Sequence, residues 1–202
     1  MEEKKNVLER VEWTQYWAES CDEDKPRALL IGDSISVGYR HAVYERIKDK
    51  YCIVTISTSK AVDNTNFLKE IEFLADEEGY EYKVIHFNNG IHGYHLPTSE
   101  YAVYYEKAVK FFLDKYPEAK LILCTSTPNT IAPENVELAP WNKAIVERNE
   151  IVKALALKYG LEIDNLYAVA DNNRGIIADD GVHYTIEGYE VLADKVAEVI
   201  LK

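Results

Sequence analysis

The sequence predicts an α/β protein in which a parallel β-sheet carries helices on both faces. Two observations favour this fold class. Short runs of apolar, β-rich residues alternate along the chain with longer stretches whose apolar residues recur at helical spacing. No repeat, low-complexity tract or Pro/Gly-rich linker divides the 202 residues, so we expect one domain over 1–202. Strands that alternate with helices form βαβ units, and their strands run parallel.

The chain is expected to begin with an amphipathic helix. Residues 7–19 place Leu8, Val11 and Trp17 on one side of such a helix, so that 1–26 is a leading helix and a connector. Five short apolar strands should follow, the last of them weak: 27–31, 52–57, 82–87, 121–125 and 161–163.

The helices between these strands are marked by their apolar spacing and by their ends. They are expected at 37–48, 66–77, 99–115 and 141–159, with a terminal helix after Thr185. Pro117 ends the third of them and Gly160 ends the fourth. Thr185 is a suitable N-cap for the last.

The charge and the cysteines of the chain limit its partners and its compartment. With 23 Lys and Arg against 35 Asp and Glu, the net charge is −12, which disfavours binding to nucleic acid or to anionic membranes. Cys21, Cys52 and Cys124 are odd in number and widely spaced, which fits a reducing compartment and argues against a disulfide framework or a zinc ribbon. No signal peptide or membrane-spanning run is present, so we expect a cytoplasmic protein, although a chain that has lost its signal peptide would look the same.

The first candidate site residue follows the first expected strand. Active sites of such sheets lie beyond the carboxyl ends of the strands. There the chain reads Gly32-Asp33-Ser34. A serine at a helix N-terminus has free backbone N–H groups beside it, which a nucleophile needs when its attack creates an oxyanion. The alternative is that Ser34 only caps the helix.

A possible base lies in the last loop before the terminal helix. Asp180 and His183 are three residues apart, so the carboxylate can meet the ring if the segment turns. The carboxylate would fix the tautomer of the imidazole, and the other ring nitrogen would act as base toward a serine. Alone, this segment is more simply an acidic surface loop. Together with Ser34 it completes a nucleophile, a base and an orienting acid.

The third candidate segment is the loop after the third expected strand. It contains Asn88, Asn89, Gly90 and His92, whose side chains or backbone could donate to an oxyanion, or only shape the loop. His86 lies within the strand and is interpreted as a packing histidine. A zinc site made by His86, His92 and His95 is disfavoured, because no carboxylate or cysteine is suitably placed to complete it.

These three segments together resemble the SGNH (GDSL) hydrolases. The resemblance runs from Arg27 to the terminal helix. It implies a three-layer α/β/α fold of flavodoxin type with a five-stranded parallel sheet. It also implies ester hydrolysis through an acyl-enzyme without a cofactor or metal. In that reaction Ser34 would be the nucleophile, His183 the base and Asp180 the orienting acid.

Two departures from the family pattern concern the oxyanion hole, to which the Ser34 N–H would contribute. The second block of the family usually supplies a glycine N–H, but the matching loop 57–60 has no glycine, so the N–H of Ser59 or Lys60 would replace it. The third block usually supplies an asparagine. Aligned on Gly90, that position is His92, so either His92 donates or Asn89 reaches in from before the glycine. The variant block resembles an offshoot found among bacterial carbohydrate-associated esterases.

The sequence therefore predicts a serine esterase that removes small acyl groups, and the leading substrate is an O-acetylated sugar. Tyr94, Trp141 and Tyr184 could stack on sugar rings, although core packing is the commoner role of such residues. The first alternative is a lysophospholipase or thioesterase, which would need an apolar channel. The second is a non-catalytic flavodoxin-like module that binds a phosphate or nucleotide. It is disfavoured because 32–38 is not the Gly/Thr-rich loop that cradles phosphate.

Overall fold

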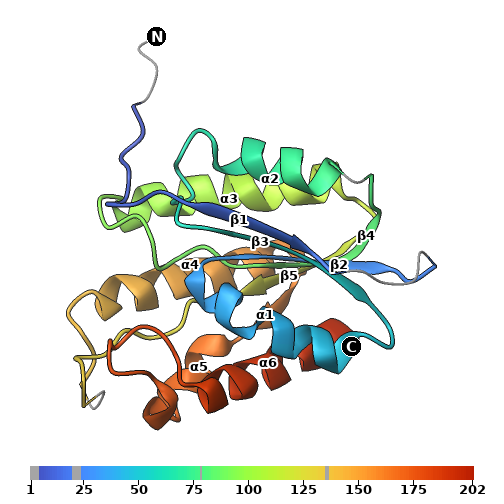
Figure 1. Cartoon of the computed structure of the whole chain (residues 1–202). Helices are drawn as coiled ribbons and strands as arrows, with labels where there is room; N and C mark the ends of the chain where they lie inside the picture. Colours follow the sequence, from blue (N-terminus) through green and yellow to red (C-terminus); the bar gives the residue numbers. More distant parts are fainter. Residues whose placement is uncertain (1–4, 20–23, 78, 135–136) are drawn as a thin grey trace.

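The protein is built on one central β-sheet (Figure 1). The computed structural model describes residues 5–19, 24–77, 79–134 and 137–202. In these residues the sheet has six strands in the order β1-β3-β2-β4-β5-β6. The strands are β1 (Thr14–Ala18), β2 (Arg27–Gly32), β3 (Cys52–Thr58), β4 (Tyr82–Phe87), β5 (Lys120–Cys124) and β6 (Glu162–Asp164). All five expected strands are present and pair in parallel, and β1 is an additional strand, antiparallel to β3.

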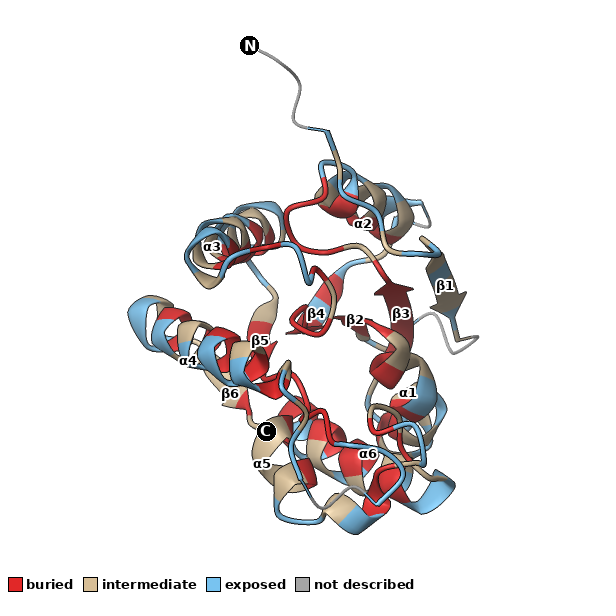
Figure 2. Cartoon of the chain, turned by 90° about the vertical axis from the view of Figure 1, so that its left-hand side faces the viewer, coloured by how far each residue is buried: buried red, intermediate tan, exposed pale blue. Residues whose placement is uncertain are grey.

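Helices cover both faces of this sheet (Figure 2). The helices α2, α3 and α4 pack against one face, and α1, α5 and α6 pack against the other. Their bounds are α1 (Ser34–Ile47), α2 (Phe67–Asp76), α3 (Thr98–Lys115), α4 (Asn142–Tyr159), α5 (Leu166–Asp171) and α6 (Ile186–Leu201). A 3₁₀ helix, η1 (Arg174–Ile176), follows α5, and neither of these short elements was predicted. The predicted three-layer α/β/α fold is confirmed.

The composition of the central strands follows from this layering. In β2, Ala28 and Leu30 belong to the apolar cluster under α1 and α6, while Leu29 and Ile31 belong to the cluster under α2 and α3. Successive side chains of a strand point to opposite faces. A strand covered on both faces therefore needs an unbroken apolar run, and that run is what identified β2 in the sequence.

The predicted leading helix over 7–19 is wrong. Residues 5–13 have no regular structure, and Thr14–Ala18 forms β1 on the edge of the sheet. Leu8 and Val11, which were expected on the buried side of a helix, are both 64% exposed. The aromatic residues of this segment, including Trp17, favour an extended strand, and β3 offers it an open edge to pair with.

The expectation from the cysteines also needs correction. Cys52, the first residue of β3, is disulfide-bonded. Cys124 is a buried free thiol. Cys21 lies outside the described residues. Spacing along the chain was a poor guide because a disulfide depends on the distance between two Cα atoms in space.

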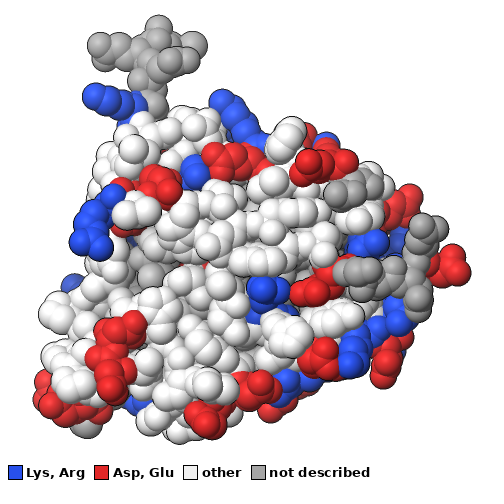
Figure 3. All heavy atoms as spheres, viewed as in Figure 1, with Lys and Arg blue, Asp and Glu red and all other residues white. Residues whose placement is uncertain are grey.

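On the face seen in Figure 3, neither acidic nor basic side chains form a single dominant patch. Acidic and basic side chains are mixed around the rim of this view, and uncharged side chains fill much of its centre. Among the described helices, none combines the length and the apolar character that crossing a bilayer requires.

Candidate active site

The turn after β2 lies where the strand order of the sheet changes direction, because β3 and β4 lie on opposite sides of β2. β2 pairs with β3 on one side and with β4 on the other. The crevice at the carboxyl end of such a strand is where α/β sheets bind ligands. Ser34 is the first residue of α1, so its backbone N–H has no acceptor within the helix. The helix begins three residues earlier than predicted, because its cap lies at Asp33.

Asp33, and not Ser34, caps this helix. Its Oδ1 accepts the backbone N–H of Ile35 at 2.9 Å. Its Oδ2 is buried and has no hydrogen-bond partner among the described residues. Burial raises the pKa of Asp33 above its ordinary value, although the nearby charges of His92 and His183 and the Ile35 N–H act in the opposite direction. The capping role considered for Ser34 is thus taken by its neighbour, and the Ser34 hydroxyl is left for another partner.

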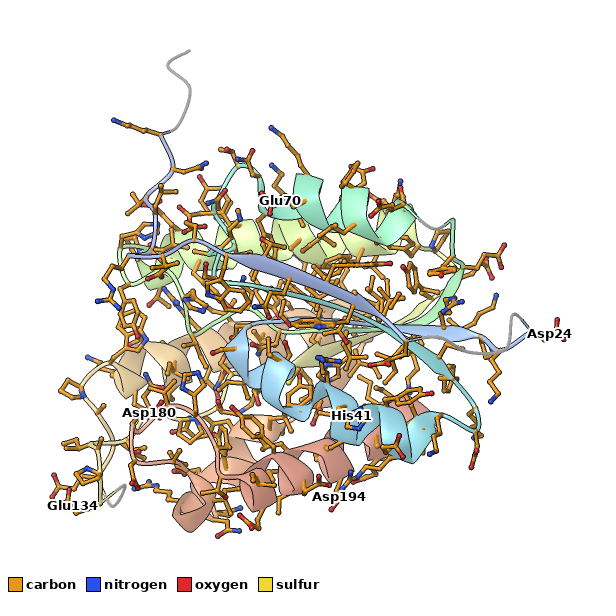
Figure 4. The ribbon with its side chains drawn as sticks, in the orientation of Figure 1. Asp24, His41, Glu70, Glu134, Asp180 and Asp194 are labelled. Atoms are coloured by element: carbon orange, nitrogen blue, oxygen red, sulfur yellow. The ribbon has the colours of Figure 1, made fainter. Side chains whose placement is uncertain are left out.

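That partner is His183, in the loop before α6. The Nε2 atom of His183 is 2.9 Å from Ser34 Oγ, and its Nδ1 atom is 2.6 Å from Asp180 Oδ2. The other carboxylate oxygen, Asp180 Oδ1, accepts the backbone N–H groups of Val182 and His183. Figure 4 labels Asp180 on the side of the molecule toward which β2 runs. The three side chains that the sequence singled out form one hydrogen-bonded chain.

The loop that carries Asp180 and His183 is fixed by a close backbone contact. Gly181 has a φ of +76°, and a Cβ at this position would lie 2.4 Å from the carbonyl oxygen of Thr130. The Thr130 N–H donates to the Gly181 carbonyl at 2.9 Å. The loop after β5 is anchored in turn by Asn149, whose side chain exchanges two hydrogen bonds of 2.8 Å with the backbone of Ser126. Only glycine permits this approach, so the Asp180–His183 turn is set by the fold around it.

The Asp180 carboxylate should stay ionised throughout the working pH range. Its burial alone would raise its pKa, but the hydrogen bonds from the His183 ring and from two backbone N–H groups lower it below its ordinary value. We therefore expect the titration of Asp180 to add no step to the pH profile of kcat/KM for an ester between pH 5 and 9. Comparison of the wild-type profile with that of Asp180→Asn measures this. A step in that range that is lost in Asp180→Asn, with the rest of the profile unchanged, would contradict the expectation.

The lowered pKa of Asp180 also affects the stability of the folded protein. A carboxylate with a depressed pKa stabilises the folded state above the pH at which an unfolded aspartate titrates, about 4. That contribution disappears as the pH falls through the lower pKa of the folded protein. Because Asp180 and His183 are about half exposed, the effect on the free energy of unfolding should be small.

The backbone donors predicted after β3 are both occupied. The N–H of Ser59 donates to the Trp13 carbonyl at 3.1 Å, extending the pairing between β1 and β3. The N–H of Lys60 donates to Thr58 Oγ1 at 3.1 Å. The assignment of Ser59 to an oxyanion hole is therefore wrong. It failed because no pattern in the sequence indicated that an N-terminal strand would use this edge.

The two asparagines after β4 hold the loop in place. Asn88 Nδ2 donates to the Cys124 carbonyl at 2.8 Å and lies 3.1 Å from Ser126 Oγ. Asn89 Nδ2 donates to the Lys60 carbonyl at 2.8 Å, and Asn89 is 5% exposed. This contact makes Asn89 the weaker of the two candidates for a side-chain oxyanion donor.

His92, the other candidate, has one ring nitrogen without a partner. Its Nδ1 atom is 3.5 Å from a carboxylate oxygen of Glu9. Its Nε2 atom is buried and makes no hydrogen bond to any described residue. A positive charge on either the His92 or the His183 ring would lower the pKa of the buried Asp33 carboxyl at the start of α1. His92 thus keeps one ring nitrogen for a further partner.

The loop that carries His92 is clamped by a residue that the sequence analysis missed. Arg148 lies on α4 and is 1% exposed. Its Nη1 atom donates to the carbonyls of Gly90 and His92, at 3.0 and 2.7 Å. Its Nη2 atom donates to those of Gly93 and Leu96, at 2.7 and 3.1 Å. Burial lowers the pKa of Arg148. A signal was present, because position 148 falls on the buried stripe of α4 with Ile145 and Val152.

Replacing this guanidinium should loosen the loop. A lysine keeps the charge but has three donors on one atom and no planar fork, so Arg148→Lys should lower the free energy of unfolding by about 2 kcal/mol. It should also lower kcat about tenfold, through a less well positioned His92. Urea unfolding and steady-state kinetics measure the two effects. Arg46→Lys is the matched control, because Arg46 pairs with Glu190 and Asp194 at the surface, where such pairs contribute little. Equal stability of the two variants would contradict the clamp.

Two of the three aromatic residues proposed to bind substrate lie together. The rings of Tyr94 and Trp141 have centroids 4.3 Å apart, and Tyr94 is 55% exposed. Arg148 lies over the Trp141 ring, 5.0 Å from its centroid. Tyr184 does not join them. It is 5% exposed and packs edge-on against Tyr189 in the core, so neither face of its ring is open to a sugar.

The histidines considered for zinc are dispersed. Each pairs with a different carboxylate: His86 with Asp164 at 2.9 Å, His92 with Glu9 at 3.5 Å and His95 with Asp63 at 3.1 Å. Within the described part of the chain, one group of possible metal ligands comes close together, namely His86, Cys124 and Asp164, all buried. There His86 Nε2 and Asp164 Oδ2 are joined by a hydrogen bond of 2.9 Å, while His86 Nδ1 and Asp164 Oδ1 are buried without a hydrogen-bond partner among the described residues.

No known protein family matches this sequence. No curated protein matches it either. Solved structures do match. One is a candidate GDSL-like lipase from Parabacteroides merdae, with 15% identity, coverage of 89% of this chain and 98% of the other, and a TM-score of 0.66. A second is Est24, a carbohydrate acetylesterase from Sinorhizobium meliloti, with 19% identity, coverage of 87% and 98%, and a TM-score of 0.66.

A third similar structure is a catalytic mutant of Axe2, an acetylxylan esterase from Geobacillus stearothermophilus. It shares 16% identity, with coverage of 87% of this chain and 94% of the other and a TM-score of 0.67. By name, these three solved structures are thus two esterases and a candidate lipase. The chain has the fold of the SGNH (GDSL) hydrolases, as the resemblance in its sequence implied.

Proposed function

We propose that the protein is a serine esterase that removes small acyl groups, in particular O-acetyl groups from carbohydrates. The observation that carries this proposal is the chain of two hydrogen bonds from Ser34 through His183 to Asp180, of 2.9 and 2.6 Å, at the switch point of the sheet. A serine, a histidine and an aspartate in this order are the groups that acyl transfer needs.

The reaction would proceed in two steps on Ser34. In the first, Ser34 Oγ attacks the ester carbonyl while His183 Nε2 accepts the hydroxyl proton, and the tetrahedral intermediate collapses to an acyl-serine. His183 gives its proton to the departing alcohol. In the second, a water molecule loses a proton to His183 and attacks the acyl-serine, which releases the acid and restores Ser34. Asp180 holds the ring and stabilises its charged form in both steps.

Several features support a carbohydrate as the alcohol part of the ester. Tyr94, two residues after His92, is exposed and packs against the ring of Trp141, which is half-buried and lies beside Arg148. Aromatic faces are a common surface for sugar rings. Two of the structures with this fold are an acetylxylan esterase and a carbohydrate acetylesterase by name.

One observation favours a second candidate, a lipase or thioesterase acting on longer acyl chains. An open groove of about 470 Å³ lies at the start of α4, and its lining is mostly apolar. The apolar residues that line it are Leu138, Ala139, Pro140 and Val146. A groove of this kind could accept an alkyl chain.

A series of p-nitrophenyl esters separates the two candidates, and acetate release from acetylated xylo-oligosaccharides tests the sugar. Highest kcat/KM on the acetate ester, with acetate released from the sugar, is the expected result. Activity that rises from acetate to octanoate would overturn the acetylesterase in favour of the second candidate. No turnover of any ester and no labelling of Ser34 by a fluorophosphonate would exclude both and leave a binding module. The Ser34→Ala variant is the blank for every assay.

A further inference from the structure

Three buried side chains with metal-binding atoms meet near the carboxyl ends of neighbouring strands. His86 lies in β4, Cys124 ends β5 and Asp164 ends β6, and these strands are side by side in the sheet (Figure 2). One ring nitrogen of His86, the sulfur of Cys124 and one carboxylate oxygen of Asp164 lie within 4.8 Å of one another. His86 and Asp164 are 0% exposed and Cys124 is 1% exposed. The proposed ester hydrolysis uses none of these three side chains.

The register of the sheet brings the three residues to one face. Cys124 and Asp164 are direct partners in the pairing of β5 with β6, and His86 is the partner of Leu30 in the pairing of β2 with β4. Paired residues of neighbouring strands point to the same face. Leu30 and Cys124 both belong to the apolar cluster under α1 and α6, so all three side chains lie on that face. Their proximity is thus fixed by strand pairing and not by the conformation of a loop.

Hydrogen bonds within the cluster leave two possible ligand atoms without a partner. His86 Nε2 and Asp164 Oδ2 share one hydrogen bond of 2.9 Å. His86 Nδ1 and Asp164 Oδ1 are buried and have no hydrogen-bond partner among the described residues. A buried polar atom without a partner costs free energy. A pair that served only to fill the core would be expected to use these atoms, so they point to a further partner.

No fixed positive charge of the described residues neutralises the carboxylate of this cluster. Arg148 is the only buried lysine or arginine among them, and its guanidinium binds carbonyls of the loop after β4. A second buried carboxyl, that of Asp33, lines a small cavity together with Cys124. An uncompensated negative charge is costly in the protein interior. A divalent cation held by one carboxylate, one thiolate and a neutral imidazole would make a neutral site.

The types of ligand select zinc among the common divalent ions. Zn²⁺ binds thiolate, imidazole and carboxylate together, whereas Mg²⁺ and Ca²⁺ take oxygen ligands. Nitrogen, oxygen and sulfur ligands of a tetrahedral zinc ion are roughly 3.3–3.6 Å apart, so the cluster would contract by at most about 1 Å on binding. The cavity that Cys124 lines has a volume of about 10 Å³, which is room for one water molecule as the fourth ligand.

We propose that His86, Cys124 and Asp164 bind a zinc ion in the core, which joins β4, β5 and β6 near their carboxyl ends. Zinc binds a cysteine as the thiolate, so the thiol proton of Cys124 passes to solvent when the metal enters. All three ligands are buried, so the ion has a structural role and stabilises the folded chain. The inference does not depend on the proposed esterase function.

Metal content, thermal unfolding and cobalt spectroscopy test the site. The full chain is expressed in metal-depleted medium, or with added zinc or added cobalt, and loosely bound metal is removed by gel filtration with EDTA. The zinc-grown protein should hold about one zinc per chain and unfold roughly 5–10 °C higher than the metal-depleted protein. The cobalt-grown protein should show the near-ultraviolet absorption of a cobalt–thiolate bond. A folded wild type with less than about a tenth of a zinc per chain and no such absorption would overturn the proposal.

Cys124→Ser and Asp164→Asn each remove one ligand with little change of shape. Each should lower the bound zinc at least tenfold and abolish the rise in thermal stability, and Cys124→Ser should also remove the cobalt–thiolate absorption. His95→Gln is the matched control, because His95 also faces a carboxylate, that of Asp63 at 3.1 Å, and should bind zinc as the wild type does. Equal zinc in the wild type and in both ligand variants would place the ion elsewhere and overturn the site. Where a ligand variant does not fold, the cobalt spectrum of the wild type decides.

Ser34→Ala separates this inference from the proposed function. The variant should hold as much zinc as the wild type while it turns over no ester. An active esterase that binds no zinc would leave the proposed function intact and overturn the metal site. A chain that binds zinc through Cys124 and hydrolyses no ester would support the site and exclude the function.

Discussion

Ser34→Ala should abolish ester hydrolysis and leave the fold unchanged. The hydroxyl oxygen is the atom that forms the acyl-enzyme, and no other group can replace it, so kcat should fall by roughly 10³-fold or more. The stability should hardly change, because the helix cap is Asp33 and the Ser34 side chain is partly exposed. Steady-state kinetics with p-nitrophenyl acetate measure the loss, and thermal unfolding checks the fold.

The serine two residues further on supplies the control. Ser36 is buried, and its Oγ atom is within 2.7 Å of the Asp33 carbonyl and 2.6 Å of Ser57 Oγ. Ser36→Ala should therefore cost about 1 kcal/mol of stability and retain labelling of Ser34 by a fluorophosphonate. The two variants have opposite phenotypes, which separates chemistry from folding. If Ser34→Ala keeps more than a tenth of the wild-type kcat, Ser34 is not the nucleophile.

The second large effect is expected at His92. Its Nε2 atom is buried and has no hydrogen-bond partner among the described residues, and the alignment on Gly90 puts His92 at the position where the family has its side-chain donor. His92→Ala should lower kcat by roughly 10²–10³-fold with little change in KM, because the contact strengthens only in the transition state. His92→Asn should recover part of the loss, since an amide can also donate. Kinetics on the acetate ester, with KM and kcat measured separately, decide the point.

Asn89→Ala is the comparison that makes this prediction specific. The Asn89 amide donates to the Lys60 carbonyl, so its removal should cost about 1 kcal/mol of stability and clearly less activity than His92→Ala. If the order of the two kcat values is reversed, Asn89 is the donor and the alignment on Gly90 is wrong. If neither variant loses even tenfold, backbone N–H groups alone hold the oxyanion.

The fold was predictable because the central strands and the long helices obey local rules. β2 is an unbroken apolar run from Ala28 to Ile31, and α4 ends at Gly160, which adopts the left-handed conformation that glycine favours. The N-terminal segment was not predictable in the same way. Its apolar residues fit a helix by spacing, and only the free edge of β3, which is a property of the whole sheet, turns 14–18 into a strand.

The site residues also fall into two groups, those marked by a local motif and those positioned by contacts from distant parts of the chain. Ser34, Asp180 and His183 were found because each lies in a short motif at a strand end or loop. Arg148 and Glu9 act on the loop after β4 from far away in the chain, through contacts to backbone carbonyls and an N–H. Such contacts leave no motif, because any residue has a carbonyl to offer. Ser59 was misassigned for the related reason that its N–H was already committed to Trp13.

The antiparallel strand β1 has a consequence for the solubility of the chain. All seven residues of β3 are buried, and β1 covers the edge that β3 would otherwise expose. An uncovered edge strand is a template on which other chains can add strands and aggregate. β1 is itself a short edge of five residues, and uncharged side chains occupy much of the face around it in Figure 3. A truncation that removes 5–18 would therefore be expected to make the protein aggregate, and this effect should be larger than any effect on the reaction at Ser34.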